Sequence, residues 1–449
     1  KKGAAGFYAR HYSSNGKVPL ENKQRVFAGV MDNDATLTGK KFFRKSYAGL
    51  SASYLQRTGY AYGYDTEQPF DFARRDIRQS YYDIGLDGSF ASMNPDSTDL
   101  AFNFGLSYDY FRNTADRYLN HAGFNGELSK LYKDFYAGGK INIDHYTFSE
   151  SLGLDPRYIF TVNPYVRKSS GQWNFNLGLK LSVQKNPLDK SKIYFHPDLG
   201  FGFTIIPEYL QFFSELNGRL ESNDPLNVIS QNPFIVPDGS LFKVPDTNHS
   251  LEISAGLKGN NGLGGNYLLS VSYSLVNDML FYSNVVYPDT ASRIERGNHF
   301  LVITDDADIL NFHGEMTGNF SDRMSFRASA NYYKYTLSAS PYAWNRPDWD
   351  GKLGLYYNLR NKIIAGTEFT ALGARKLMIS KSPTGWMTLE PEIRDEPVHV
   401  NLGISAEYRY TKILSFWIKV NNISWNRYNE WAFYPSQMFN FLAGFTYSL

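Results

Sequence analysis

Apolar and polar residues alternate one by one over long stretches of this chain. From Leu100 to Tyr110 the even positions are apolar or aromatic, whereas the odd positions from Asp99 to Asp109 are polar or small. The same period of two recurs at 172–184, 398–410 and 439–449. Because successive side chains of a β-strand point to opposite faces of the sheet, this period predicts strands. No window shows the apolar spacing of a helix together with capping residues.

Tracing the alternation through the whole chain predicts about eighteen strands. They lie near 44–57, 81–92, 99–111, 122–132, 135–148, 158–168, 172–185, 192–206, 208–221, 248–259, 265–286, 298–319, 323–338, 349–359, 362–379, 397–410, 412–423 and 439–449. Most runs are longer than the five or six residues usual in soluble proteins, and they match the roughly ten residues that cross a bilayer at a tilt. Their length therefore favours membrane-spanning strands.

The connections between these strands alternate between short and long. Short turns are expected at 133–134, 169–171, 260–264, 321–323, 360–361 and 411–412, and longer links at 149–157, 186–191, 222–247, 288–297, 339–348, 380–396 and 424–438. Outer-membrane barrels have short periplasmic turns and longer external loops. The connection lengths and the strand lengths thus both indicate a membrane-spanning barrel.

These patterns predict an all-β protein, a closed antiparallel transmembrane β-barrel of about eighteen strands, with fourteen to sixteen as the alternative. A sheet in hydrocarbon must close because an unpaired backbone amide costs several kcal/mol there. A soluble sandwich or propeller would also alternate, but propeller strands are short and carry periodic blade motifs that are not found here. The predicted barrel is 44–449, and 1–43 is expected to be an N-terminal periplasmic or lumenal segment of short extended pieces.

Composition narrows the class of protein further. Aromatic residues make up 16% of the chain, which suits the aromatic girdles of a barrel. The 46 basic and 44 acidic side chains give a net charge of only +2, so no nucleic-acid partner is expected. There is no Cys, which excludes disulfides, thiol catalysis and Cys-based metal sites. A mean hydropathy of −0.41 argues against a bundle of membrane helices.

The C-terminal part carries recognisable motifs. Leu414 to Trp431 reads LSFWIKVNNISWNRYNEW, and Tyr434 to Leu449 reads YPSQMFNFLAGFTYSL. With 195–210 and 232–238, these segments resemble the barrel of TonB-dependent receptors and receptor-like proteins of Bacteroidota. The likeness covers the chain from about Tyr158 onward and implies a location in the bacterial outer membrane, in contact with its lipid and lipopolysaccharide. Receptors of this family begin with a plug domain larger than the segment 1–43, so no plug domain is expected within this chain.

Enzyme signatures are missing, and no enzyme activity, cofactor or metal site is predicted. His249, His313 and His399 occupy polar positions of predicted strands, where hydrogen-bonded lumen residues are more common than catalytic bases. Two acidic groups offer oxygen atoms to Ca²⁺ but lack the glycine and glutamate of an EF-hand loop; they are Asp305, Asp306 and Asp308, and Asp32 and Asp34. Aromatics in the long links are assigned to the membrane girdle; they are Tyr342, Trp344, Trp349, Trp425, Tyr428, Trp431 and Tyr434.

Charged residues on the polar face of the strands are the candidate lining of the lumen. They are Lys180, Glu252, Lys258, Glu315, Arg327, Glu407, Arg409 and Lys419. Because both signs are present, a strongly ion-selective pore is not expected. The favoured function is a porin-like or plug-less transporter-like barrel for small solutes. The alternative is a structural or accessory barrel of an outer-membrane complex that binds other outer-membrane or periplasmic proteins.

Overall fold

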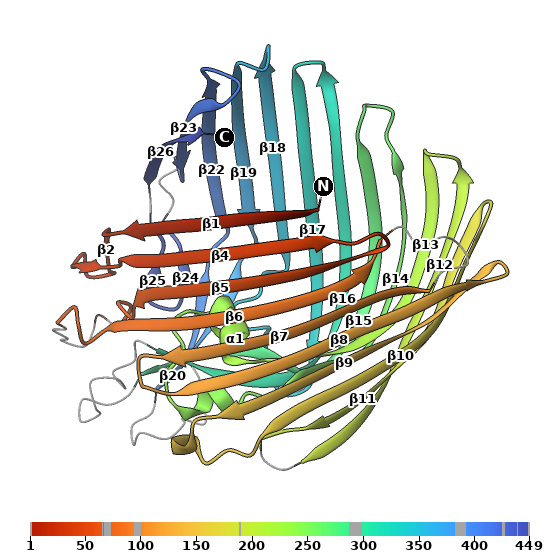
Figure 1. The fold of residues 1–449 in the computed structure, drawn as a ribbon. Helices are drawn as coiled ribbons and strands as arrows, with labels where there is room; N and C mark the ends of the chain where they lie inside the picture. Colours follow the sequence, from red (N-terminus) through yellow and green to blue (C-terminus); the bar gives the residue numbers. More distant parts are fainter. Residues whose placement is uncertain are drawn as a thin grey trace.

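The computed structural model describes residues 2–64, 66, 73–93, 100–187, 190–286, 299–381, 392–423, 427–437 and 439–447. Its main sheet has 22 strands, of which β20 (Arg375–Lys381) and β21 (Glu392–Glu396) form a side hairpin. The others follow one another as antiparallel neighbours around a curved wall (Figure 1). They are β1 (Gly3–Ser14), β4 (Val30–Phe42), β5 (Ser46–Tyr60), β6 (Arg78–Ser92), β7 (Ala101–Asn113), β8 (Tyr118–Tyr132), β9 (Phe135–Phe148), β10 (Arg157–Ser170), β11 (Trp173–Lys185), β12 (Ser191–Ile206), β13 (Leu210–Glu221), β14 (Thr247–Asn260), β15 (Asn266–Val286), β16 (His299–Ser321), β17 (Met324–Leu337), β18 (Trp349–Leu359), β19 (Ile363–Leu372), β22 (His399–Arg409), β23 (Leu414–Asn421) and β26 (Asn440–Tyr447).

The prediction of an all-β antiparallel sheet is confirmed, and every predicted strand overlaps an observed one. The predicted strand 362–379 is divided into β19 and β20 at Gly373, whose N–H donates to the Trp349 carbonyl at 2.8 Å. A Cβ atom at Gly373 would lie 3.0 Å from the Trp349 ring, so the close approach at this corner suits glycine. Beyond the corner, β20 pairs in parallel with the end of β15.

The segment 1–43 differs from its prediction, because it contributes two full strands to the sheet. β1 pairs with β4 from Gly3 opposite Lys41 to Ser14 opposite Val30, and β4 pairs with β5. β1 is rich in Ala, Gly and Ser and β4 in Asp and Thr, so their alternation of apolar and polar residues is weak. The antiparallel run therefore has two strands more than the eighteen predicted.

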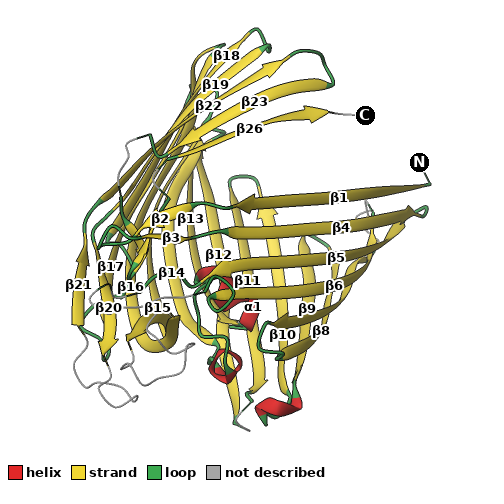
Figure 2. Cartoon of the chain, turned by 90° about the vertical axis from the view of Figure 1, so that its left-hand side faces the viewer, coloured by secondary structure: helices red, strands yellow, loops and turns green. Residues whose placement is uncertain are grey.

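The first and last strands form the two borders of this run. Among the described residues, no ladder joins β26 to β1, and Figure 2 shows the two borders diverging toward the end where both chain termini lie. At the opposite end they are linked: the Tyr62 hydroxyl donates to the Pro435 carbonyl at 3.0 Å, and the Gln437 amide donates to Ser14 Oγ at 3.3 Å. The predicted complete closure is thus not part of the described sheet.

Turns and loops separate to opposite ends, as predicted. At the turn end, Lys133, Gly171, Arg360 and Asn361 take left-handed backbone conformations with φ between 53° and 56°, which tight hairpins require. The loop end carries the short hairpins β2 (Lys17–Pro19) with β3 (Arg25–Phe27) and β24 (Asn429–Trp431) with β25 (Tyr434–Pro435). It also carries α1 (Pro225–Gln231), η1 (Glu150–Leu152) and η2 (Gly239–Lys243), drawn in red in Figure 2. Among the described residues, no helix is long and apolar enough to span a membrane.

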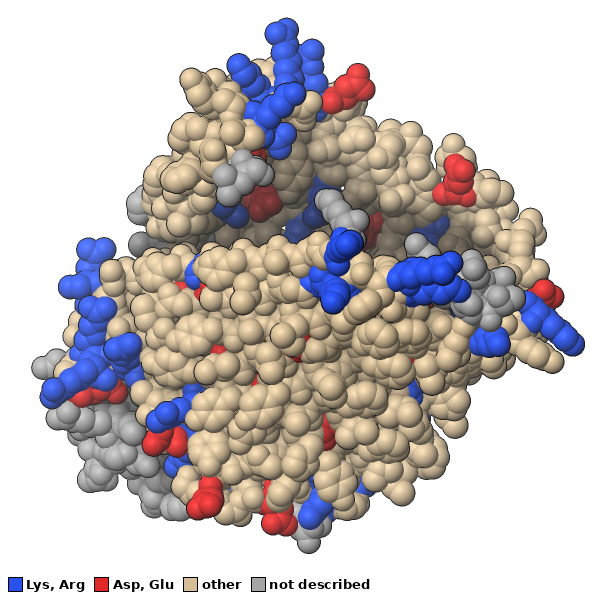
Figure 3. Space-filling model, viewed as in Figure 1, with Lys and Arg blue, Asp and Glu red and all other residues tan. Residues whose placement is uncertain are grey.

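The outer face of the sheet is apolar and exposed. Leu106, Leu177 and Phe195 have 64%, 52% and 67% of their surface accessible, although each lies in the middle of a strand. Figure 3 shows the same property as a broad band almost without charge, with Lys and Arg gathered at its ends. A contiguous apolar surface of this extent is the mark of contact with lipid. The buried apolar cluster lies instead inside the curve at the loop end.

Candidate functional site

The link between β13 and β14, residues 222–246, folds into the mouth of the curved sheet at the loop end. It begins with Asp224, whose side chain accepts from the Asn227 N–H at 2.9 Å and caps the N-terminus of α1, with Pro225 in the first turn. It continues through η2, where Asp238 caps the Ser240 N–H at 2.8 Å. We call residues 222–246 the cap. Local capping thus gives this long link a defined structure.

A buried ion pair fixes the cap to the wall. Arg157 Nη1 lies 3.0 Å from Asp246 Oδ1, and the two side chains are 5% and 1% exposed. Asp246 also accepts from the Asn223 N–H at 3.0 Å, so both ends of the cap meet at one carboxylate. Burial raises the pKa of Asp246, and the neighbouring Arg157 opposes that rise. The pair therefore anchors the cap to the wall, and loss of either side chain would leave the other charge buried without a partner.

The apolar side of the cap spans the mouth from one wall to another. Phe242 packs against Phe111 of β7 with ring centroids 6.3 Å apart. Phe234 stacks on Tyr434 at 3.8 Å, and Tyr434 lies 5.8 Å from Phe300 of β16. Since β7 and β16 lie far apart along the run of paired strands, these contacts make the cap a bridge across the interior.

A second loop meets the cap and is held by the side hairpin. Arg375 of β20 donates to the Asn429 carbonyl at 2.7 Å, and Glu396 of β21 accepts from the Asn429 N–H at 2.8 Å. Trp431 of this loop contacts Tyr282 of β15 edge to face at 5.1 Å. The β20–β21 hairpin therefore positions residues 427–437 against the cap.

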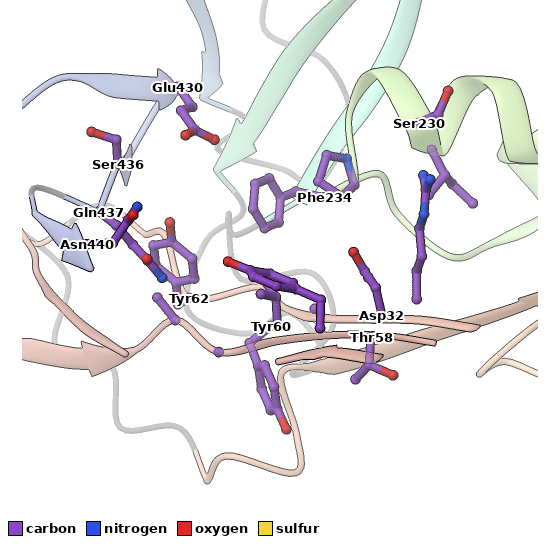
Figure 4. Close-up of a pocket in the computed structure, with 18 of the residues that line it drawn as sticks. Asp32, Thr58, Tyr60, Tyr62, Ser230, Phe234, Glu430, Ser436, Gln437 and Asn440 are labelled. Atoms are coloured by element: carbon purple, nitrogen blue, oxygen red, sulfur yellow. The ribbon is translucent and has the colours of Figure 1, made fainter. Parts of the chain in front are cut away.

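Between the cap, this second loop and the strands at the two borders of the sheet lies a cavity of about 490 Å³. Figure 4 shows Phe234 and Glu430 from the loops and Asp32 from β4 around it. Its lining combines aromatic rings, side-chain amides and charged groups, among them Tyr60, Tyr62, Phe234, Arg57, Asp32, Glu430, Asn401, Asn421, Gln437 and Asn440. Ring faces and amides together suit a small polar solute with hydroxyl or amide groups.

Burial changes the titration of the groups that the loops bring to this cavity. It raises the pKa of Glu430, while Arg375 lowers it to a smaller extent. Burial, helped by Glu430, raises the pKa of Tyr428 to about 12. Burial thus shifts both groups toward their protonated forms relative to the same groups in water.

The predicted lumen residues lie on the face opposite the exposed apolar residues, but they do not form one cluster. Lys180 donates to Asn217 Oδ1 at 2.6 Å, and Glu252 accepts from Arg219 at 3.5 Å. Lys258 and Glu315 line a second cavity of about 610 Å³ near the turn end. Glu407 and Arg409 pair with each other at 3.3 Å. Arg327 is exposed and Lys419 partly buried, on β17 and β23. A role for these residues in a solute path stays a prediction.

The histidine and aspartate candidates are separated and have structural partners. His249 lies 3.1 Å from Glu221, His313 lies 2.8 Å from Asn331, and His399 stacks on Tyr428. Asp305, Asp306 and Asp308 accept hydrogen bonds from Ser340, Asp278 and Tyr273, and Asp34 pairs with Arg10. Asp32 lines the cavity at the sheet borders. Within the described part of the chain, no group of three or more His, Asp or Glu residues is arranged to hold a metal ion.

The assignment of the loop aromatics to the membrane girdle is wrong for several of them. Tyr434 and Trp344 are 0% and 2% exposed, and Trp431 packs on the buried cluster of the cap. Tyr342 and Trp349 are partly exposed, and Trp425 lies outside the described residues. The prediction failed because the same residue types serve a membrane interface and a buried loop core.

The site residues that the sequence did not indicate are those of the cavity. Arg57 and Tyr60 come from the end of β5, Tyr62 from the link just after it, Asn401 from β22, and Asn440 from β26. Nothing in their local sequence links them, because the site forms only when the first and last strands meet the cap. The one available signal was the pair Asn421 and Asn422 in the C-terminal motif, and both of these residues line the cavity.

Comparison with known proteins identifies the fold. No family model and no curated protein matches the chain. Among solved structures, the siderophore receptor PirA from Acinetobacter baumannii matches with a TM-score of 0.73 and 11% identity, covering 100% of this chain and 75% of that one. The copper transporter OprC matches with a TM-score of 0.70 and 13% identity, over 100% and 76%.

The ferripyoverdine receptor of the outer membrane of Pseudomonas aeruginosa matches with a TM-score of 0.66 and 12% identity, covering 99% of this chain and 70% of that one. These neighbours are receptors and transporters, and they agree with the predicted location in the outer membrane. At this level of identity they establish architecture alone. This chain therefore has the fold of the outer-membrane siderophore receptors and metal transporters.

Proposed function

We propose that this chain is the barrel of an outer-membrane transporter, which admits a small polar solute from the loop end and binds it in the cavity beside the cap. The observation that carries the proposal is the position of that cavity. It lies in the mouth of a fold shared with outer-membrane receptors and transporters, between a bridging cap and the borders of the sheet. Its amides and tyrosines supply orienting hydrogen bonds, and its rings supply stacking surfaces.

The proposal includes a closed wall in the membrane. The free edges of β1 and β26 would otherwise expose rows of backbone N–H and C=O groups to hydrocarbon, each at a cost of several kcal/mol. Pairing of these edges, with each other or with further strands, removes that cost. No TonB-linked energy source and no plug are part of the proposal, which concerns the pathway formed by the wall and the cap.

Solute-induced stabilisation tests the proposed binding cavity. Purified protein in detergent is heated with a panel of small polar solutes, namely pentoses, disaccharides, dipeptides and amino acids. One class is expected to raise the melting temperature, because a ligand that binds only the folded state stabilises it. Asn421→Ala and Tyr62→Ala are expected to abolish that shift and to slow uptake of the same solute into proteoliposomes.

Asn125→Ala, on the lumen wall away from this cavity, serves as the matched control and keeps the shift. A shift that survives both cavity variants contradicts the proposed site. If no solute is bound and proteoliposomes take up none, while pull-down recovers a stoichiometric protein partner, the chain is an accessory barrel rather than a transporter.

A further inference from the structure

The two ends of the sheet differ in how their charges are arranged. At the turn end, basic residues crowd the hairpin tips: Lys41, Arg44, Lys133, Arg323, Arg360 and Lys412 are all exposed. The carboxylates among the same tips are few, with Asp134 and Asp322 beside Lys133 and Arg323. Figure 3 shows Lys and Arg side chains gathered at the top and right of the molecule, beyond the uncharged band. We call the six named basic residues the basic rim.

The loop end carries basic residues too, and several of them are paired with acids. Arg112 pairs with Asp116, Lys376 with Asp395, and Arg394 with Glu21. Within the part of the chain that the structure describes, none of the six residues of the basic rim has an ion pair to a carboxylate. The positive charge of the rim is therefore left for a partner outside the chain.

Exposed aromatic residues lie directly next to the rim, on the side of the apolar band. Lys41 lies over the Phe43 ring at 5.6 Å, Lys133 over Tyr132 at 5.7 Å, and Lys168 over Phe135 at 4.5 Å. Tyr132, Phe320 and Tyr410 are each more than 60% exposed. Aromatic rings of this kind lie at the boundary between hydrocarbon and headgroups, and long basic side chains reach from there toward the headgroup phosphates.

We propose that the basic rim binds anionic phospholipid headgroups of the leaflet that faces the turn end. A phosphate placed beyond the aromatic boundary meets ammonium and guanidinium groups that have no acid of their own. The rim is spread along the wall, since its residues come from hairpins near the start, middle and end of the sheet. It is thus suited to a ring of lipids around the protein and not to one compact ligand. The inference needs the membrane location but not the transport role.

Lipid binding by a rim variant tests this directly. The protein in a neutral detergent is titrated with phosphatidylglycerol or phosphatidylethanolamine, and bound lipid is counted by native mass spectrometry. Parent protein is expected to retain phosphatidylglycerol preferentially. The variant Lys41→Gln, Arg44→Gln, Arg360→Gln, Lys412→Gln is expected to lose roughly a thousandfold in affinity for it, with little change for phosphatidylethanolamine.

The matched control removes four exposed basic residues from the loop end, by Lys17→Gln, Lys23→Gln, Arg25→Gln and Lys190→Gln. It is expected to keep the preference. Equal loss in both variants, or no loss in the rim variant, overturns the proposal, as does tighter binding of an acidic peptide than of phosphatidylglycerol. If the fourfold rim variant fails to fold, Arg360→Gln with Lys412→Gln gives the same test with an expected loss of about thirtyfold.

Discussion

Removing the cap will increase the flow of small solutes through the reconstituted protein, by roughly tenfold or more, since barrels with about this many strands enclose an aqueous channel unless something fills it. The variant replaces Leu226–Lys243 with a short Gly-Ser linker, which leaves Asp224, Asp246 and the wall in place. The reason for the effect is the bridge that Phe242 and Phe234 form between β7 and the β16 side of the mouth. Single-channel conductance in planar bilayers measures it.

Two point variants distinguish the effect of displacing the cap from the effect of deleting its residues. Val228 is fully buried in the apolar cluster under the cap. Val228→Asp places an unpaired charge there and is expected to displace the cap and raise conductance. Lys243→Gln changes an exposed residue of η2 and is expected to leave conductance unchanged. Unchanged conductance after removal of the whole cap would show that the cap does not narrow the pathway.

Breaking the anchor of the cap has the second large effect. Arg157→Ala leaves Asp246 buried without its cation and is expected to cost about 3–5 kcal/mol of cap stability, the usual penalty for removing one partner of a buried pair. Because each 1.4 kcal/mol is about a factor of ten in population, cleavage of residues 222–246 by a protease added from the loop side is expected to rise by roughly two to three and a half orders of magnitude.

Replacing both partners discriminates between this account and a general loss of packing. The double variant Arg157→Met, Asp246→Leu removes both charges together, and it is expected to recover most of the protease resistance. The exposed pair of Arg112 and Asp116 is the control, since Arg112→Ala is expected to change little. Equal sensitivity for the Arg157 and Arg112 variants contradicts the anchoring role.

The wall could be predicted from sequence because its physics is local. Within each strand, apolar and polar residues alternate because successive side chains point to opposite faces, as in 173–185. This alternation can be recognised from the strand's own sequence, without knowing which strands lie beside it. β1 and β4 were missed because small residues occupy both of their faces. The corner at Gly373 was missed because it depends on the contact with Trp349, far away along the chain.

The site was largely invisible because it depends on which loops meet. Tyr434, Phe234 and Tyr62 come from three separate links and touch only in the folded chain. A buried loop core and a membrane girdle use the same residue types, so composition could not separate Tyr434 from the partly exposed Trp349. The charged candidate residues could be assigned to the polar face of their strands from the two-residue period, whereas the side chains they contact could not be predicted.

One face of each strand of the wall meets lipid, and the other faces the interior. Because the chain contains no Cys, single cysteines at Asn174, Phe175, Asn176, Leu177, Gly178 and Leu179 of β11 can each carry a spin label without further changes. In proteoliposomes, the account predicts that collision with oxygen alternates along the strand, high at Phe175, Leu177 and Leu179 and low at the three residues between them. Uniform accessibility to a water-soluble nickel chelate at all six positions would contradict it.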